Sequence, residues 1–352
     1  MAAESAYAAA GVDILAGERA VELMKASVAA SHRSEVLGGL GGFAGFFDAS
    51  ALARYTRPVL ATSTDGVGTK VAIARAMGVY DTIGWDLVGM LVDDLVVTGA
   101  EPLFVTDYIA CGHVVPERIA GIVSGIAEAC VAAGAALLGG ETAEHPGLMG
   151  PDDFDMAGAT VGVVEADEMI GAERVRPGDV VVAMASSGLH SNGYSLVRRV
   201  LLDEAGLSLE ASIPELGRTV GEELLEPTRV YALDALALIH GVQVHAMSHI
   251  TGGGLANNLA RVLPGTVTAH LDRGAWTPPA IFALVQRLGQ VSQRDIEATL
   301  NMGVGMAAVV APEDADAAVQ LLADRGVDAW ICGEMVASSA EDPRVELAGQ
   351  HR

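Results

Sequence analysis

TDGVGTK, at residues 64–70, follows an apolar, β-branched run at residues 58–64 (PVLATST) and precedes a helix-forming run that starts at Lys70. The apolar run predicts a buried strand, which ends at two glycines separated by one residue. Glycines let backbone N–H groups approach an anion closely, and the helix start adds partial positive charge. Asp65 supplies a hard oxygen ligand and Lys70 a point charge for a phosphate. The stretch therefore predicts a strand–turn–helix unit with a magnesium–nucleotide site, the alternative being an ordinary turn with a surface lysine.

The lysine content of the chain sharpens this prediction. Lys25 and Lys70 are the only lysines, and the other basic residues are arginines. Lysine carries a compact, strongly hydrated charge, so its presence beside a glycine turn favours contact with a phosphate.

Composition and charge exclude several classes of protein. The chain has 352 residues, enough for two domains of ordinary size, and it is 51% hydrophobic but only 4% aromatic, as in helix-covered sheets. A net charge of −24 argues against non-specific nucleic-acid binding, although a bound cation can reverse the field locally. The three widely spaced cysteines, at 111, 130 and 332, predict inert core residues without disulfides. Because no apolar run reaches about 20 residues and no signal pattern opens the chain, we expect a cytoplasmic protein.

Acidic residues interrupt a predicted helix at residues 82–98. Its apolar residues recur at helical spacing, and Gly99 follows as a stop signal. A solvated helix face would account for Asp86. It would not account for the adjacent Asp93 and Asp94, which interrupt apolar residues and suit a bound cation better.

The glycine-rich stretch at residues 38–44 (GGLGGFA) matches a dinucleotide-binding fingerprint in spacing only. No apolar strand precedes it, and no helix clearly follows it. We interpret it as a tight backbone bend.

Strands and helices alternate through the rest of the chain, which predicts an α/β fold with two domains, residues 1–170 and 171–345. The pattern restarts near residues 171–178, where arginines and a Pro-Gly-Asp turn separate two apolar runs. The expected strands lie at residues 103–110, 135–138, 154–165 (able to pair antiparallel), 180–185, 266–271, 304–311 and 328–336. The expected helices lie at residues 116–134, 194–204, 230–239, 255–262, 279–288 and 313–325.

Polar residues that could carry chemistry gather in four loops and in a glycine turn. The loops are residues 65–70, 93–94, 139–145 and 186–192, and the turn is residues 249–254. Asp65, Asp94 and Glu141 are candidate Mg²⁺ ligands, because this ion uses one or two carboxylates together with substrate phosphates. A surface loop acid is the alternative for Glu141.

The loop at residues 186–192 predicts a substrate site. His190 is a candidate general base or electrophilic partner, with a turn-stabilising histidine as the alternative. The neighbouring Ser186, Ser187, Ser191 and Asn192 suit anion or substrate donation, since no G-x-S-x-G elbow is present. The glycines of Gly252–Gly254 stand at a predicted helix start and fit a phosphate monoester, the alternative being a plain N-cap turn.

No short nucleotide fingerprint is satisfied. GVGTK lacks the spacing of the P-loop, and no kinase signature is present. The residues alone indicate a two-domain α/β protein that uses magnesium and a nucleotide and binds a second, anionic substrate.

Eight motifs, in order, resemble the phosphoribosylformylglycinamidine cyclo-ligase family, the AIR synthetases. They are AGVDI (10–14), GGLGGF (38–43), TDGVGTK (64–70), DLVVTGAEPLF (94–104), GGETAEHPG (139–147), SSGLHSNGYSLVR (186–198), ITGGGL (250–255) and MGVGM (302–306). The resemblance covers about residues 5–336. Related ATP-dependent enzymes, such as thiamine-monophosphate kinase, share only the general plan, and the fifth and sixth motifs point to the cyclo-ligases.

The resemblance implies a two-domain AIR-synthetase-like fold of the α/β (α+β) class. N-terminal strands of two subunits would form a shared β-barrel in a homodimer, with ATP near the dimer interface, and a C-terminal α/β sandwich domain would cover the cleft. The implied reaction is the cyclisation of formylglycinamidine ribonucleotide (FGAM) to aminoimidazole ribonucleotide (AIR) in purine synthesis. It would consume ATP with Mg²⁺, pass through a phosphorylated amide, and release ADP and phosphate. No nucleic-acid or membrane partner is implied.

Roles for individual residues follow from the motifs and this resemblance. Lys70, His190 and Asp65 would be catalytic, and Asp65, Asp94 and Glu141 would hold Mg²⁺. The ATP-binding set would be Asp65, Gly66, Val67, Gly68, Thr69, Lys70, Asp94, Glu141 and Thr142. The substrate-binding set would be Ser187, His190, Ser191, Asn192, Gly252, Gly253 and Gly254.

One departure and one alternative function accompany the resemblance. Many family members carry YKDAGVD near the N-terminus, whereas Tyr7 here is followed by Ala8 and Ala9, so a phosphate contact by that lysine is absent or replaced. The alternative is a non-catalytic member that binds a nucleotide or a sugar phosphate. Such a member would be expected to lose its charged loop residues, which are all present here. Among enzymes, the nearest rival is another ATP-dependent phosphotransferase of the same fold.

Overall fold

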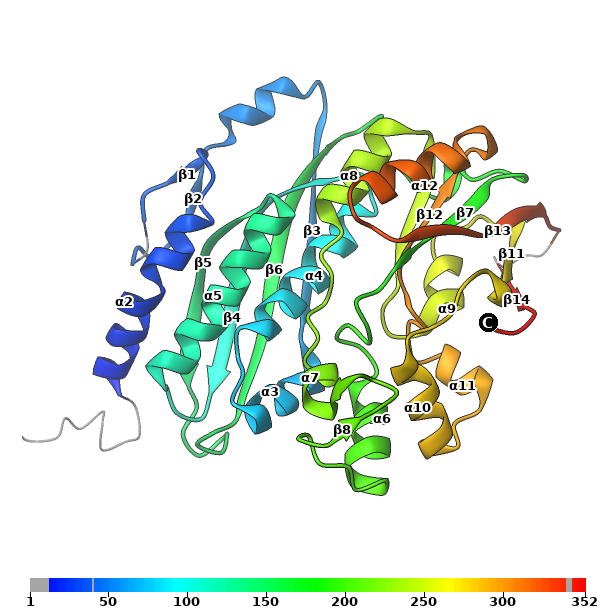
Figure 1. Cartoon of the computed structure of the whole chain (residues 1–352). Coiled ribbons are helices and arrows are strands. Elements are labelled where there is room, and N and C mark those ends of the chain that lie inside the picture. Colours follow the sequence, from blue (N-terminus) through cyan, green and yellow to red (C-terminus); the bar gives the residue numbers. More distant parts are fainter. Residues whose placement is uncertain (1–12, 40, 340–343) are drawn as a thin grey trace, which may run out of the picture. The chain divides into compact units, whose positions relative to one another are not determined.

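The computed structural model describes residues 13–39, 41–339 and 344–352, so Tyr7, Ala8 and Ala9 and the start of AGVDI lie outside the described residues. The chain forms two compact units (Figure 1). The first comprises the residues up to Leu95 together with Pro102–Glu165, and the second comprises Val96–Glu101 together with Ala166–Arg352. Each unit packs helices on a β-sheet, so the predicted α/β class is confirmed.

The first unit carries a four-stranded sheet in the order β3-β6-β4-β5. Its strands are β3 (Pro58–Gly66), β4 (Glu101–Cys111), β5 (Ala136–Glu144) and β6 (Phe154–Glu165), with a small β1 (Val36–Leu37) and β2 (Phe46–Phe47) pair. Its helices are α2 (Ile14–Ala30), α3 (Val71–Met77), α4 (Thr82–Val96) and α5 (Pro116–Ala133), with 3₁₀ turns η1 (Ala49–Arg54) and η2 (Gly68–Lys70). β3 pairs antiparallel with β6, as the sequence allowed, and β4 pairs parallel with β5.

Local sequence explains the helix that joins β4 to β5. α5 begins with Pro116, which lacks a backbone N–H at a position where an N–H would have no partner within the helix. Its C-cap is Gly134, whose φ of 71° is in the left-handed region that favours glycine. Its inner side chains, including Ile119, Ile122 and Ile126, are fully buried. A strand–helix–strand crossover of this kind produces the parallel β4–β5 pair.

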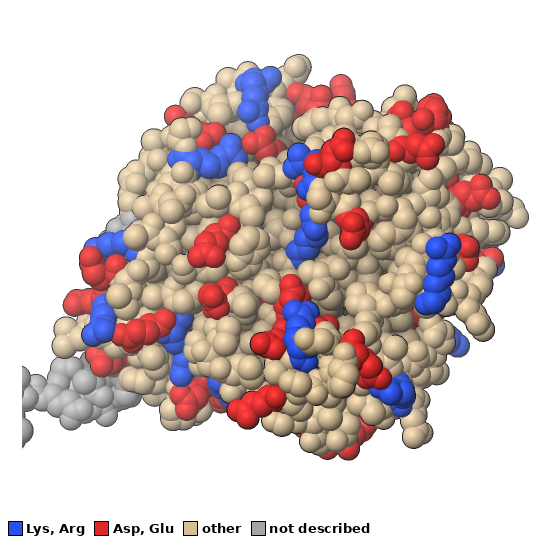
Figure 2. All heavy atoms as spheres, in the orientation of Figure 1, with Lys and Arg blue, Asp and Glu red and all other residues tan. Residues whose placement is uncertain are grey.

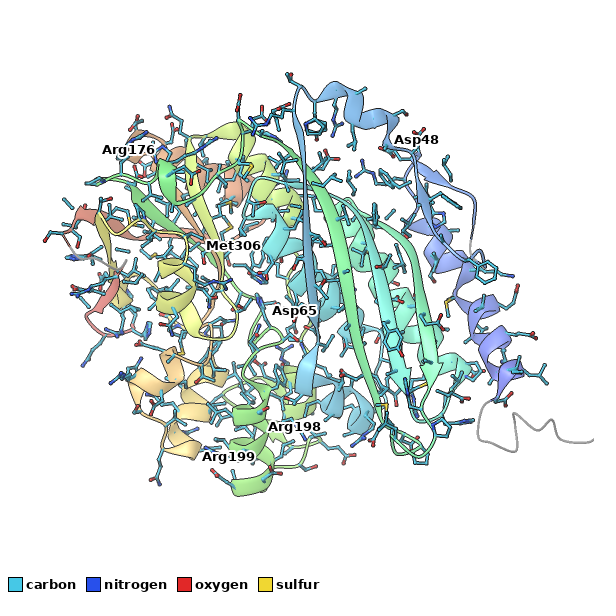
Figure 3. The ribbon with its side chains drawn as sticks, turned by 180° about the vertical axis from the view of Figure 1, so that it is seen from behind. Asp48, Asp65, Arg176, Arg198, Arg199 and Met306 are labelled. Atoms are coloured by element: carbon cyan, nitrogen blue, oxygen red, sulfur yellow. The ribbon has the colours of Figure 1, made fainter. Side chains whose placement is uncertain are left out.

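One face of the first unit's sheet is covered by α4 and α5, and the view from behind shows the opposite face (Figures 1 and 3). Side chains on the opposite face remain accessible: Leu60 on β3 is 61% exposed and Tyr108 on β4 is 42% exposed. Large apolar side chains on an open sheet face are typical of a protein interface.

The second unit carries a six-stranded sheet in the order β10-β12-β7-β13-β11-β14. Its strands are β7 (Val180–Ala185), β10 (Val244–His249), β11 (Val267–Asp272), β12 (Val304–Val310), β13 (Ala329–Ala337) and β14 (Arg344–Ala348), with a small β8 (Ser212–Ile213) and β9 (Arg218–Thr219) pair. Its helices are α6 (Tyr194–Arg198), a π-helical η4 (Arg199–Glu204), α7 (Val220–Leu224), α8 (Ala232–Gly241), α9 (Gly254–Ala260), α10 (Ala280–Gly289), α11 (Gln293–Glu297) and α12 (Ala315–Asp324). Short 3₁₀ turns are η3 (Ala172–Arg174), η5 (Arg273–Ala275) and η6 (Pro312–Asp314).

The strand β12, second in this order, has all seven of its residues buried. A core cluster joins it to β7 through Val181 and Ala183, and to α9 through Leu255 and Leu259. The strand pairs of this sheet are antiparallel, except that β11 pairs parallel with β14.

Two expectations about local structure are wrong. Residues 139–144 continue β5 instead of forming a loop, because their backbone pairs with β4 as far as Cys111. The glycines at 139 and 140 weaken the strand signal without preventing pairing. The run at residues 58–64 forms a strand, as expected, but not a buried one, because β3 lies at the edge of its sheet and none of its residues is fully buried. The expected helix at residues 194–204 is present, with π-helical geometry from Arg199 onward.

The surface and the thiols agree with the composition. On the face shown in Figure 2, acidic side chains are interspersed with basic ones. The three cysteines are unpaired and buried, as predicted, and burial raises the pKa of each thiol. Among the described residues, no helix has the length and apolar character to cross a membrane.

Candidate active site

The TDGVGTK turn connects β3 to α3 in the first unit and leaves its polar groups accessible. Asp65 is exposed near the end of β3, and its Oδ1 accepts the Gly66 N–H at 2.7 Å (Figure 3). A Cβ on Gly66 would lie 2.9 Å from the Met156 carbonyl oxygen, and Gly68 has a φ of 71°. Both glycines are therefore required by the turn itself, which leaves Asp65, Gly68 and Thr69 at the surface.

Lys70 lies in the interior instead of on the surface of this turn. Its Nζ is 2.8 Å from Asp86 Oδ1 on α4, and both side chains are completely buried. The alternative of a surface lysine is wrong, and so is the solvated helix face proposed for Asp86. A fully buried ion pair costs desolvation energy on both ions, so this pair places strong demands on its surroundings.

The two other acids of α4 differ in exposure. Asp93 is completely buried, whereas Asp94 is partly exposed. Of the pair, Asp94 is thus the one placed to reach a ligand from solvent.

Glu141 and Thr142 lie on β5 beside a cavity of about 490 Å³ within the first unit. The cavity is lined by α2, Gly39, residues 41–45, β4 and residues 137–142 of β5. Asp107 of β4 also lines it, opposite Gly140, where any Cβ would overlap the Asp107 carboxylate. Burial raises the pKa of Asp107 to about 7, against an opposing hydrogen bond from the Glu141 backbone N–H. The cavity thus combines apolar walls with two acidic side chains and two threonine hydroxyls, those of Thr106 and Thr142.

The three candidate metal ligands fit Mg²⁺ in chemical type, because carboxylate oxygens are its preferred protein ligands. They are not gathered at one point. Asp65 is on β3 and Glu141 on β5, at opposite edges of a four-stranded sheet, which separates them by about 14 Å. Within the described ranges, no three His, Cys, Asp or Glu side chains form a metal-binding group. A magnesium ion held mainly by phosphates and water needs only one or two of them.

In the second unit, the loop after β7 is organised around His190. This side chain is 1% exposed, its φ is 61°, and its Nε2 accepts the Ser187 N–H at 3.2 Å. Its ring centroid lies 6.1 Å from that of Tyr231, whose hydroxyl donates to the Ala185 carbonyl at 2.6 Å. The hydrogen bond from the Ser187 N–H to His190 Nε2 is the contact that the turn-stabilising alternative requires. Because Nε2 accepts this bond, the neutral ring carries its proton on Nδ1.

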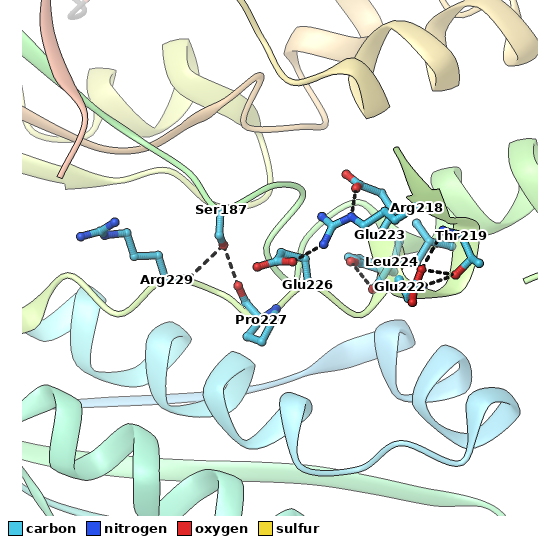
Figure 4. A network of polar contacts seen from close by, with 10 residues as sticks. Ser187, Arg218, Thr219, Glu222, Glu223, Leu224, Glu226, Pro227 and Arg229 are labelled. Carbon is cyan, nitrogen blue, oxygen red and sulfur yellow. Dashed lines mark hydrogen bonds and ion pairs between the residues drawn. The ribbon is translucent and has the colours of Figure 1, made fainter. Parts of the chain in front are cut away.

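Ser187 links this loop to the segment before α8 (Figure 4). Its Oγ donates to the Pro227 carbonyl at 2.6 Å and accepts the Arg229 N–H at 3.2 Å. Just before this segment in the sequence, Arg218 of β9 binds Glu223 at 2.6 Å and also Glu226. Ser187 thus uses its hydroxyl on backbone groups of its own unit.

The glycine turn before α9 approaches the 186–192 loop, as a shared substrate site requires. A Cβ on Gly252 would lie 3.5 Å from Asn192 Oδ1. Gly253 has a φ of 103°, and a Cβ on Gly254 would overlap the Glu297 carbonyl. The plain-turn alternative therefore explains Gly253 and Gly254 in part, whereas a Cβ on Gly252 would make only an ordinary contact with Asn192.

Several residues that organise these sites were not singled out by the sequence patterns. Asn258 donates from Nδ2 to the Gly254 carbonyl at 2.9 Å and to those of Thr251 and Gly252 at 3.3 Å. Asn301 donates to the Gly188 carbonyl at 2.9 Å. For Asp107, the available signal is an acid within an otherwise apolar strand.

Family models of AIR synthase related proteins match the chain twice, the N-terminal domain at residues 47–164 and the C-terminal domain at residues 176–346. A phosphoribosylformylglycinamidine cyclo-ligase from Geobacillus kaustophilus is 48% identical over 347 residues, which cover 99% of each chain.

Solved structures with low sequence identity share the fold. Thiamine-monophosphate kinase from Stenotrophomonas maltophilia has a TM-score of 0.69 at 19% identity, covering 95% of this chain and 97% of that one. A hydrogenase maturation protein in complex with ATP has a TM-score of 0.62 at 18% identity, covering 96% and 92%. The two-domain AIR-synthase-like fold is therefore confirmed.

Proposed function

Since the chain belongs to the phosphoribosylformylglycinamidine cyclo-ligases of the AIR synthase family, we propose that it converts FGAM to AIR in de novo purine synthesis. ATP is consumed, and ADP and phosphate are released. The observation that supports this proposal most strongly is the similarity to a cyclo-ligase over 99% of both chains, a range that includes the turns at residues 64–70 and 186–192. We place the reaction in the cytoplasm.

The chemistry explains the need for ATP. An amide oxygen is a poor leaving group, so transfer of the γ-phosphoryl group to the formyl oxygen creates a phosphorylated amide. The amidine nitrogen of the same substrate then attacks the activated carbon, the ring closes, and phosphate leaves. Because both reacting groups belong to one molecule, positioning can supply much of the rate.

The first unit is proposed to bind ATP. The turn at Gly66–Thr69, of which Gly68 and Thr69 are exposed, would face the phosphates, and Glu141 and Thr142 would contribute from the cavity on β5. Asp65, Asp94 and Glu141 would hold Mg²⁺, which would polarise the transferred phosphoryl group. The accessibility of Asp65 and the partial accessibility of Asp94 support this assignment.

The separation of Asp65 from Glu141 supports a homodimer. Opposite edges of one sheet cannot contribute to one compact nucleotide site across about 14 Å. A second copy docked on the open sheet face, where Leu60 and Tyr108 are exposed, would bring the β3 edge of one subunit near the β5 edge of the other. We therefore propose that the sheets of two first units form a shared barrel.

The second unit is proposed to bind FGAM. Ser191, Asn192 and the backbone of Gly252–Gly254 would hold the anionic ribonucleotide, with Ser187 fixing the loop from behind. His190 would manage the proton of ring closure. Because Nε2 accepts from Ser187, the neutral ring carries its proton on Nδ1.

The test is to follow ADP and AIR in parallel from the purified protein with Mg-ATP, with and without FGAM. Equal amounts of both products, formed only when FGAM is present, are expected. ADP without AIR would indicate another phosphotransferase of this fold. Absence of both products from a folded dimer would indicate a binding subunit.

A further inference from the structure

The least accessible charged side chains near the TDGVGTK turn are Lys70 and Asp86. Their 2.8 Å ion pair joins the last residue of η2 to the second turn of α4, and neither side chain has any exposed surface. Two ions in such surroundings are stable only with precise geometry, because their mutual attraction must offset the loss of hydration. The pair therefore fixes the distance between the elements that carry it.

Two of the proposed ATP-binding acids are close to this pair in the sequence, Asp65 at the end of β3 and Asp94 on α4. Asp65 precedes Lys70 by five residues, and the turn between them is also tied to β6 through the Val67 N–H, which donates to the Met156 carbonyl at 3.4 Å. Asp94 follows Asp86 by eight residues on the same helix, about 12 Å along its axis. The ion pair thus connects the Asp65 turn with the helix that presents Asp94.

We infer that Asp86, through Lys70, is a positioning residue that holds the Asp65 turn in register with α4. This inference rests on the proposed function, because it assigns a task within the same ATP site. The Lys70 ammonium is neutralised by Asp86 and shielded from solvent, so it acts on the phosphates through the position of the turn and not by contact.

The two possible roles of Lys70 predict opposite results for paired substitutions. A positioning ion pair can be replaced by two apolar side chains of similar volume, which removes both buried charges together. A lysine that contacts a phosphate cannot be replaced by methionine in any background. The decisive comparison is therefore between Lys70→Met, Asp86→Leu and the double variant Lys70→Met/Asp86→Leu.

Each variant is assayed as the full-length protein for ADP and AIR formation, with kcat and the KM for ATP determined separately, and for thermal unfolding. We expect each single substitution to lower kcat on the order of 100-fold, as misplacement of a catalytic group by about 1 Å does. The double variant should recover to within about tenfold of the wild type, with its KM for ATP nearly unchanged. Arg287→Met, which breaks an exposed 3.0 Å ion pair with Glu215, is the control and should leave activity unchanged.

The inference would be overturned by a double variant that unfolds at the wild-type temperature and binds ATP, yet is as inactive as Lys70→Met. It would show that the ammonium itself contacts the phosphoryl group. If the single apolar variants do not fold, Asp86→Asn provides the comparison, since it keeps the shape and removes the charge; full activity in that variant would equally contradict the inference. The proposed function is judged on the wild type alone, because AIR formation there stands whatever the variants do.

Discussion

The turn at residues 64–70 and the loop at residues 186–193 share one plan, a strand that ends in small polar residues and leads into a helix, but they are held by different forces. The turn at residues 64–70 is held in place by the buried Lys70–Asp86 ion pair. The second is fixed by uncharged contacts, among them Ser187 N–H to His190 Nε2 and Asn301 to the Gly188 carbonyl. Removing either partner of a fully buried ion pair leaves an unpaired buried charge, which is strongly destabilising. In a set of neutral hydrogen bonds, each substitution removes only one smaller contribution to stability.

The largest expected effect concerns the ion pair. Lys70→Met leaves the Asp86 carboxylate buried without its counter-ion, so the free energy of unfolding should fall by about 3–5 kcal/mol. Urea unfolding of the wild type, of this variant and of Lys70→Met/Asp86→Leu measures the change, and the double variant should regain most of it. A loss below about 1 kcal/mol in Lys70→Met, as for an exposed pair, would remove the contrast between the two turns.

The second prediction separates the two roles of His190. Glutamine can replace Nε2 as the acceptor for Ser187, and asparagine can replace Nδ1 as a donor while tolerating the positive φ. If His190 transfers a proton, both His190→Gln and His190→Asn should lower kcat by about 10²–10⁴ with little change in thermal unfolding. Near-normal kcat in His190→Gln would instead identify the histidine as a turn-stabilising residue.

The contrast between the turns also shows what the sequence could and could not predict. The apolar run at 58–64, the two glycines after it and the switch to helical spacing predicted β3, the turn and α3 within a few residues. The residues themselves predicted a magnesium–nucleotide site there, and the resemblance of the ordered motifs supplied the family. These signals are local, so they can be recognised without the fold.

Other features depend on contacts between distant residues. Asp86 has the spacing of a solvated helix face, and only the packing of α4 against the Lys70 turn shows that it is buried. Residues 139–144 have weak strand propensity, and their pairing with β4 decides that they are a strand. The placement of Asp65 and Glu141 on opposite edges of the sheet follows from strand order, which neither motif encodes.

The third prediction tests how closely the second unit's loop is packed. A Cβ on Gly305 would lie 2.6 Å from His190 Cε1 and would overlap the Tyr231 hydroxyl. Gly305→Ala should therefore lower the free energy of unfolding by about 1–3 kcal/mol and reduce kcat by displacing His190. The matched control is Gly121→Ala on α5, where the nearest atom is Tyr80 Cβ at 3.8 Å, and it should be neutral or stabilising.

An unchanged unfolding curve for Gly305→Ala would show that the aromatic pair can move aside. The loop at residues 186–193 would then be adaptable as well as uncharged, which would increase its contrast with the rigid ion-paired turn.

The smallest expected effect is the contribution of one buried thiol in each unit to the pH dependence of the free energy of unfolding. In the second unit, burial raises the pKa of Cys332 to about 12. In the first unit, burial and, to a smaller extent, the nearby Glu144 carboxylate raise the pKa of Cys111 to about 11. Both values exceed the reference value of 9.0, so above pH 9 the unfolded chain loses these protons first and the free energy of unfolding falls as pH rises. Between pH 9 and pH 10 each thiol should contribute about 1 kcal/mol to that fall.

Cys332→Ala and Cys111→Ala remove these contributions one unit at a time. Each variant loses some stability at every pH from the cavity it creates, so the informative quantity is the difference between its unfolding free energies at pH 9 and pH 10, compared with the same difference in the wild type. The two variants should each reduce that difference by a similar amount, because both folded-state values lie above pH 10. A pH dependence that stays at the wild-type level in one variant would mean that its thiol ionises in the folded protein, and that the interior around it is more accessible to water than that of the other unit.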